Sequence, residues 1–348
     1  MEPLGNVVKS HGKHGGSAVK VLIAGGAGFI GSTVASACLD HDITPVILDN
    51  LHTGRREFTV GRAFYEGDIA DPDLLDRVFD DHPEIEAAVL CAALISVPES
   101  VLDPVTYYEE NVVKALRFLE GLARRGCSRL LFSSSASVYG TSDTLLVDED
   151  APLRPESPYA RTKATCEVMF ADIAKATDLR VLSLRYFNPI GADPQMRSGL
   201  QLMLPSHALG QLIRCHESGD DFRVTGTDYP TRDGTGIRDY VHVWDLALAH
   251  VAALERFDHV VGPSHYEVIN LGSGLGTTVR ELVDAFNTVV SPPVDVVDAP
   301  RRPGDVAGAY AGRVKAQLLL NWVPERSLTE GMTDSLAWAV TRRTVLGG

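Results

Sequence analysis

One stretch of glycines near the N-terminus constrains the fold of this chain more than any other feature. Gly25, Gly28 and Gly31 directly follow a short aliphatic run at residues 19–24, and residues 29–40 continue with helical periodicity. Glycines at this spacing allow a tight turn, a close approach of the backbone to a ligand, and close packing of a helix on a strand. The amides and the positive dipole end of the helix then favour a bound pyrophosphate. The pattern predicts a strand–turn–helix unit that binds a dinucleotide.

Strand and helix signals alternate through the first half of the chain. Further apolar runs typical of buried strands occur at 44–48, 87–91, 130–133 and 180–184. Helical periodicity lies between these runs, at 74–81, 107–125 and 159–176. Continuous apolar strands that alternate with helices indicate an α/β fold, in which a doubly wound parallel sheet of the Rossmann type is covered on both faces.

The pattern loosens after residue 187, where glycine, proline and aspartate become frequent. We therefore expect a dinucleotide-binding Rossmann domain in residues 19–187. Residues 188–348 are expected to form mainly a smaller C-terminal α/β lobe that binds the substrate, with the chain returning in part to the first domain. Residues 1–18 are rich in glycine and lack an apolar segment, which is typical of a disordered tail rather than a secretory signal.

Composition argues against several classes of protein. The formal net charge of −14 disfavours a general nucleic-acid binder, which normally presents a basic face. No apolar run approaches the ~18–20 residues that span a bilayer. The five cysteines contain no C-x-x-C pair, which fits a reducing cytoplasm and no zinc site. We therefore expect a cytoplasmic protein with no nucleic-acid partner, no membrane segment and no metal.

The second strand ends at a carboxylate that indicates which dinucleotide binds. Asp49 stands 18 residues after Gly31, where it can accept hydrogen bonds from adenosine ribose hydroxyls and repel a 2′-phosphate. This favours NAD, although Arg55 and Arg56 nearby keep NADP open. Asp68 follows the third predicted strand and would flank the adenine; its alternative is a helix cap.

Two further segments carry catalytic chemistry. Ser135 ends a predicted strand, while Tyr159 and Lys163 lie four residues apart on one face of a predicted helix. A neighbouring ammonium and an oxidised nicotinamide would lower the phenol pKa of Tyr159 from about 10 toward neutral pH. The Ser135 hydroxyl would stabilise charge on the substrate oxygen. The Tyr–Lys spacing alone also fits a surface helix pair, but together with Ser135 and a dinucleotide fold it favours catalysis.

Several longer segments match a known pattern. The most specific is DYPTRDGTGIRDYVHV at residues 228–243. The others are residues 25–31, 48–51, 66–69, 133–140, 157–159, 184–189 and 299–305. On these segments, over roughly residues 19–340, the chain resembles the extended short-chain dehydrogenase/reductases and, within them, the UDP-glucose 4-epimerases.

The resemblance implies a 4-epimerase that inverts C4 of a UDP-hexose through a transient 4-keto sugar, with NAD tightly bound. Ser135, Tyr159 and Lys163 would be catalytic. The residues implied to bind NAD are Gly25, Gly28, Phe29, Ile30, Gly31, Asp49, Asn50, Asp68, Ile69, Ala92, Ala93, Lys163 and Phe187. The residues implied to bind the UDP-sugar are Ser135, Tyr159, Asn188, Arg238, Arg302, Asp305 and Ala309. The resemblance also implies a homodimer joined by residues 107–125 and 159–176, whose apolar faces otherwise fit packing on the sheet.

The chain departs from the epimerase pattern at several positions. Ile95, Glu110, Leu202 and Thr225 replace a lysine, two asparagines and an aromatic residue that many members carry, and Lys114-Ala115 replaces a Gly-Thr. These changes leave the nucleotide base and the sugar open. A small residue at Ala309, where strict glucose/galactose enzymes carry tyrosine, predicts room for an N-acetyl group or another bulky substituent.

Rival functions are weighed against the same residues. A 4,6-dehydratase usually carries Asp-Glu after the catalytic serine or threonine, and here Ala136 and Ser137 stand there. A decarboxylase and a net keto-sugar reductase stay open. A non-catalytic NAD sensor belongs to another class, and the complete set of Ser135, Tyr159 and Lys163 argues against it.

Overall fold

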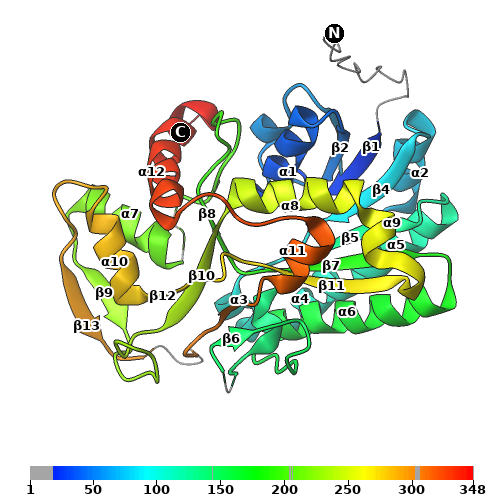
Figure 1. Ribbon diagram of the computed structural model, residues 1–348. Helices are drawn as coiled ribbons and strands as arrows, with labels where there is room; N and C mark the ends of the chain where they lie inside the picture. The colour runs from blue at the N-terminus through cyan, green and yellow to red at the C-terminus, as the bar shows by residue number, and fades with distance from the viewer. Residues whose placement is uncertain (1–18, 143, 204, 206, 302–305, 348) are drawn as a thin grey trace, which may run out of the picture.

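The computed structural model describes residues 19–142, 144–203, 205, 207–301 and 306–347. The expected tail at residues 1–18 lies outside them. A seven-stranded sheet in the order β11-β7-β5-β4-β1-β2-β3 forms the centre of the larger lobe, and all neighbouring strands are parallel (Figure 1). Its strands are β1 (Lys20–Ala24), β2 (Thr44–Asp49), β3 (Ala63–Glu66), β4 (Ile85–Leu90), β5 (Arg129–Ser135), β7 (Arg180–Tyr186) and β11 (Tyr266–Leu271).

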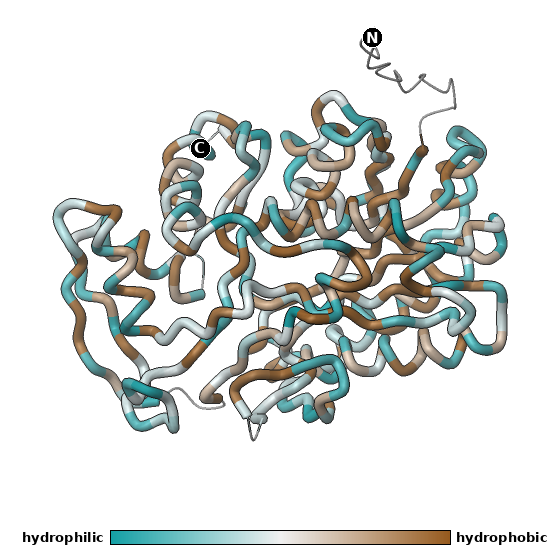
Figure 2. The backbone as a smooth tube through the Cα atoms, viewed as in Figure 1, coloured by the Kyte–Doolittle hydropathy of each residue, from teal (hydrophilic) through white to brown (hydrophobic). Residues whose placement is uncertain are grey.

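Both faces of this sheet are buried, which explains the continuous apolar runs of its strands. In β1, Val21 and Ile23 pack into one core, whereas Leu22 and Ala24 pack into the other. The first core is covered by α1 (Phe29–Asp40), α8 (Val243–Glu255), α9 (Phe257–Val261) and α11 (Val314–Leu320). The second is covered by α2 (Pro72–Asp81), α5 (Lys114–Arg124) and α6 (Pro158–Ala176). The expected doubly wound α/β fold is confirmed, and Figure 2 shows the apolar residues concentrated along the central strands.

A smaller lobe lies beyond the carboxyl ends of these strands (Figure 1). Its three-stranded sheet has the order β12-β10-β8, and β9 pairs with β13. A separate apolar core joins these strands to three helices. The strands are β8 (Asn188–Ile190), β9 (Phe222–Thr225), β10 (Ile237–His242), β12 (Gly276–Thr278) and β13 (Val296–Ala299). The helices are α7 (Ala208–Ser218), α10 (Val279–Asn287) and α12 (Leu328–Val345).

Short strands and helices connect the two lobes and lie within the loops. β6 (Leu146–Val147) pairs with β14 (Tyr310–Ala311), so the C-terminal part of the chain returns to the larger lobe. The remaining elements are α3 (Val97–Leu102), α4 (Pro104–Tyr108) and the short turns at Arg56–Thr59, Ala136–Tyr139 and Gly262–Ser264. No helix in the described part of the chain is long and apolar enough to cross a membrane.

The helix expected at residues 107–125 is interrupted. α4 passes into a π-helical turn at Glu109–Val113 before α5 begins. The turn holds Asn111, whose amide exchanges hydrogen bonds with the backbone of Leu94 at 2.8 and 2.9 Å and donates to Thr162 Oγ1 at 3.1 Å. A π turn inserts one extra residue into a helix and is frequent at functional sites. It lets Asn111 connect the loop after β4 to α6.

Candidate active site

The parallel strands bring most of the predicted site residues to one edge of the sheet. Carboxyl ends of parallel strands meet at the same edge, which here faces the smaller lobe (Figure 1). Residues that end or follow β1, β2, β3, β4, β5 and β7 lie there. They are Gly25, Asp49, Asn50, Asp68, Ile69, Ala92, Ala93, Ser135, Phe187 and Asn188.

The three glycines of the first turn have different physical roles. Gly25 has a φ of +81°, and a Cβ at this position would lie 2.4 Å from the backbone nitrogen of Ala92. A Cβ on Gly31 would lie 2.2 Å from the Gly25 carbonyl oxygen, so α1 packs against the turn only without a side chain here. Gly28 is different, because a Cβ there would meet only the Gly25 oxygen at 3.5 Å. The space over Gly28 is therefore open toward the cleft.

The start of α1 fits the phosphates of an adenosine diphosphate, and the end of β2 fits its ribose. Gly28 is the N-cap and has no side chain, so the first-turn amides, including those of Phe29 and Ile30, face the open space without a side-chain cap. Asp49 is buried, and its oxygens accept from the amides of Ala27 at 2.9 Å and Leu51 at 2.8 Å. Each oxygen keeps a second lone pair for a ribose hydroxyl. These residues fit NAD.

Asp68 is not the helix cap that was its alternative. Asp71 caps α2 by accepting from the amides of Asp73 and Leu74. Asp68 instead accepts from Lys114 Nζ at 2.6 Å, and Lys114 also pairs with Glu110 at 2.6 Å. Two of the departures from the epimerase pattern, at positions 110 and 114, therefore compensate each other beside the expected adenine site.

The carboxyl end of β5 holds the three catalytic candidates. Lys163 is buried, and its Nζ donates to the Ser133 carbonyl oxygen at 2.7 Å. Tyr159 lies one turn earlier on α6, and the Ser135 side chain interacts with its phenol and lowers its pKa. The structure thus brings together the serine, the phenol and the ammonium that the sequence predicted.

The protein groups alone raise the pKa of Tyr159, whereas the expected lowering also involved the charge of an oxidised nicotinamide. Burial raises the pKa of this phenol above its ordinary value, and the hydrogen bond with Ser135 opposes the rise only in part. Burial also lowers the pKa of the Lys163 ammonium, whose Nζ is directed to the Ser133 carbonyl. The protein groups by themselves therefore leave the Tyr159 pKa raised, and the prediction that Lys163 and an oxidised nicotinamide together lower it stays a prediction. The sequence could not reveal how far burial outweighs the neighbouring charge.

The residues expected to bind the sugar and diphosphate lie where the two lobes meet. Phe187 is buried in an apolar cluster, and Ala309 is partly buried against the same cluster. Asn188 begins β8 and lies opposite Tyr240 of β10. Arg238 of β10 donates from Nη1 to the carbonyl oxygens of Ile237 at 2.8 Å and Ala307 at 3.1 Å. The predicted residues Arg302 and Asp305 lie outside the described residues.

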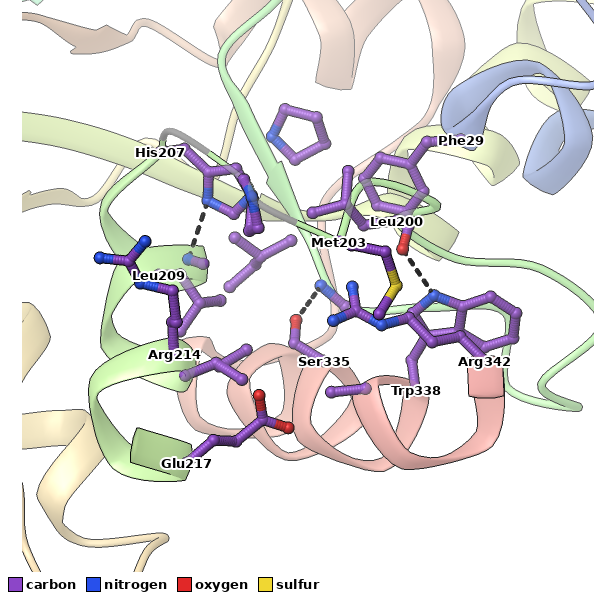
Figure 3. A pocket seen from close by; sticks show the side chains of 17 residues that line it. Phe29, Leu200, Met203, His207, Leu209, Arg214, Glu217, Ser335, Trp338 and Arg342 are labelled. Atoms are coloured by element: carbon purple, nitrogen blue, oxygen red, sulfur yellow. Dashed lines mark hydrogen bonds between the residues drawn. The ribbon is translucent and has the colours of Figure 1, made fainter. Parts of the chain in front are cut away.

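A pocket between α7 and α12 borders this site without containing its catalytic candidates (Figure 3). The helix α12 holds the loop beside the pocket through two side chains. Trp338 Nε1 donates to the Leu200 carbonyl oxygen at 2.9 Å, and Arg342 Nη1 donates to that of Leu202 at 2.7 Å. The backbone at Leu202, the position expected near the substrate diphosphate, is therefore fixed by the C-terminal helix. No pattern in the sequence predicted this role of α12.

Comparisons with known proteins agree with this site. Residues 21–272 match the family described as NAD dependent epimerase/dehydratase. The chain is 40% identical over 324 residues to a UDP-glucose 4-epimerase of Azospirillum brasilense, covering 92% of this chain and 91% of that protein. It superposes with a TM-score of 0.89 and 34% identity on a UDP-glucose-4-epimerase of Stenotrophomonas maltophila with bound NAD and formylated UDP-arabinopyranose, covering 94% and 99% of the two chains. A UDP-Glc/GlcNAc 4-epimerase of Campylobacter jejuni gives a TM-score of 0.79 at 32% identity, covering 92% and 99%.

The chain therefore belongs to the NAD dependent epimerase/dehydratase family. Within that family it groups with the UDP-glucose 4-epimerases, which confirms the resemblance in the sequence and the expected cofactor, NAD.

Proposed function

We propose that this protein inverts C4 of a UDP-hexose and that Ser135, Tyr159 and Lys163 carry the reaction. The observation that carries the assignment is the meeting of these three residues at the carboxyl edge of the sheet, beside a turn that fits NAD. The membership in the epimerase family supports the same reaction.

In the proposed mechanism Tyr159 removes the proton of the sugar 4-hydroxyl, while Ser135 donates a hydrogen bond to the same oxygen. Bound NAD supplies a reversible acceptor for the hydride of C4. The 4-keto sugar would then turn to present the other face of C4, and Tyr159 would return its proton to the oxygen. Lys163 holds the nicotinamide ribose, with its ammonium anchored on the Ser133 carbonyl. No external reductant is consumed.

We propose that the UDP part is held by Asn188, Arg238, Arg302 and Asp305, and that the sugar lies against Ala309. A guanidinium offers several donors in a fixed fork, which suits a diphosphate. The half-buried methyl of Ala309 leaves more room than a phenol would. A sugar with an N-acetyl group or a similar substituent is therefore our preferred substrate, and a similar chain from Campylobacter jejuni is named for both UDP-Glc and GlcNAc.

The proposal is tested by an epimerisation assay without added NAD. Purified protein is incubated separately with UDP-glucose, UDP-N-acetylglucosamine, UDP-glucuronate and GDP-mannose, and the products are separated by chromatography. We expect a 4-epimer without net formation of NADH, and no product from Tyr159→Phe. Net NADH, or a dehydrated or decarboxylated product, would instead support one of the rival reactions.

We further propose that the protein is a cytoplasmic homodimer. The five cysteines are all free thiols, which supports a reducing compartment. Exposed apolar side chains gather on α3, α4, the π turn and α6, which lie side by side. They are Val97, Val101, Leu102, Val105, Tyr108, Val113 and Val168.

We also propose residues 19–187 as the core of the NAD-binding domain and 188–348 as mainly the substrate lobe, with β11 returning to the large sheet.

A further inference from the structure

Three successive serines at the end of β5 each contact a different residue on one face of α6. The Ser135 side chain interacts with the Tyr159 phenol, and the Ser133 carbonyl accepts from Lys163 at 2.7 Å. Between them, the Ser134 hydroxyl donates to Glu167 Oε1. Tyr159, Lys163 and Glu167 are spaced by four residues, so they follow one another along the same side of the helix. The first two contacts belong to the proposed catalytic set, and the third has no role in it.

Glu167 is held from a second strand as well. The guanidinium of Arg185 on β7 donates from Nε to Glu167 Oε1 at 3.0 Å and from Nη2 to Oε2 at 2.6 Å. The side chains of Arg185 and Glu167 are only 5% and 4% exposed. Arg185 Nη1 also donates to the Tyr139 hydroxyl at 2.8 Å, and that hydroxyl donates to Asn270 of β11 at 2.7 Å. The carboxylate is thus fixed from β5 and β7, with support from β11.

The buried ion pair of Glu167 and Arg185 fixes the relative position of its partners more effectively than it adds stability. Removing two charges from water costs much of what their attraction returns, so buried ion pairs are weak evidence for stability. Their forked hydrogen bonds, in contrast, are satisfied only at one relative position of the partners. A shift of α6 along β5 would break the bonds of Glu167 to Ser134 and Arg185 together. The same shift would separate Tyr159 from Ser135.

We propose that Glu167, held by Ser134 and Arg185, is a positioning residue that sets the height of α6 on β5 and so aligns Tyr159 with Ser135. This inference rests on the proposed catalytic roles. The pair does not touch the substrate. It acts through Lys163 and Tyr159, which lie one and two turns before it on the helix.

The sharpest test removes the Ser134 hydroxyl and leaves the ion pair of Glu167 and Arg185 intact. Ser134→Ala deletes one hydroxyl, and Ser183→Ala is its matched control. Ser183 is a fully buried serine on β7 whose hydroxyl accepts from Tyr266 of β11 at 3.1 Å. We expect Ser134→Ala to lower kcat about tenfold, since small misplacements of reacting groups are costly, with KM and bound NAD within twofold of the parent protein. Ser183→Ala should leave kcat unchanged at a similar thermal stability.

The pH profile distinguishes positioning from a general loss of stability. A looser contact between Ser135 and Tyr159 should move the acidic limb of the kcat profile of Ser134→Ala to higher pH, because that contact lowers the Tyr159 pKa. Glu167→Gln, where it folds, should show the same shift. Unchanged kcat and an unchanged pH profile in Ser134→Ala would overturn the inference, as would equal losses in Ser183→Ala. Retained activity in Tyr159→Phe would instead overturn the catalytic assignment on which it rests.

Discussion

Tyr159 acts as a base only after it loses its own proton, and the surrounding protein works against that loss. Burial raises the pKa of the phenol, and the interaction with Ser135 opposes the rise. The protein groups therefore favour the protonated form of the Tyr159 phenol at neutral pH. The positive charge of an oxidised nicotinamide, when NAD is bound, would favour the phenolate.

Ser135→Ala should shift the pH dependence of catalysis. Because the Ser135 hydrogen bond lowers the Tyr159 pKa, its loss raises that pKa, and kcat at neutral pH falls. We expect a loss of about 10²–10³-fold at pH 7, part of which is recovered at higher pH. Steady-state kcat across the pH range checks this. A uniform loss at every pH would mean that Ser135 acts only on the substrate oxygen.

Ala309→Tyr should narrow the range of sugars. A phenol at position 309, which packs against the apolar cluster that contains Phe187, would fill the space left by the methyl group. We expect turnover of UDP-N-acetylglucosamine to fall by at least tenfold while that of UDP-glucose stays within a few-fold, since steric exclusion by a pocket amounts to about 1–3 kcal/mol. The ratio of the two kcat/KM values is the measurement. An unchanged ratio would remove Ala309 from the specificity argument.

At the scale of the element, the turn between β1 and α1 contains one glycine that we expect to matter for cofactor binding, Gly28, and one that we expect to matter for stability, Gly31. Gly28→Ala meets no close protein atom, so bound NAD should be lost while the Tm matches that of the parent protein stripped of NAD. Gly31→Ala places a Cβ 2.2 Å from the Gly25 oxygen and should reduce the free energy of unfolding by about 1–3 kcal/mol or more. Thermal unfolding and NAD released on denaturation check both variants. Equal Tm losses in the two would contradict this division.

The elements that the sequence predicts well are those with a strong local signal. β1, β2, β5 and α1 follow from apolar runs and the glycine turn. α8 escaped prediction because it is apolar around most of its surface and shows no periodicity. The π turn at Glu109–Val113 escaped because one inserted residue leaves the local composition helical. In the site, Ser135, Tyr159 and Lys163 were predictable from their spacing, whereas Glu167 was not, since its partners Ser134 and Arg185 are brought to it only by the sheet.

At the scale of the whole molecule, the exposed apolar surface on α3, α4 and α6 predicts dimerisation. Val105 is 78% exposed and Val168 is 59% exposed, which costs free energy unless a second copy covers them. Val105→Glu and Val168→Glu together should give a monomer in sedimentation experiments. Val340→Glu on α12, with 71% exposure, is the matched control and should leave the oligomeric state unchanged. A parent protein that sediments as a monomer would contradict the proposal directly.

The large sheet takes its last edge strand from a late part of the chain. β7 ends at Tyr186, but its neighbour β11 begins only at Tyr266, after much of the smaller lobe. During synthesis on the ribosome, the nascent NAD-binding domain therefore exposes the unpaired edge of β7 until Leu271 has emerged, and such edges invite pairing with other chains. Because domains generally fold as they emerge, this protein must delay completion of its first domain until about three quarters of the polypeptide is made.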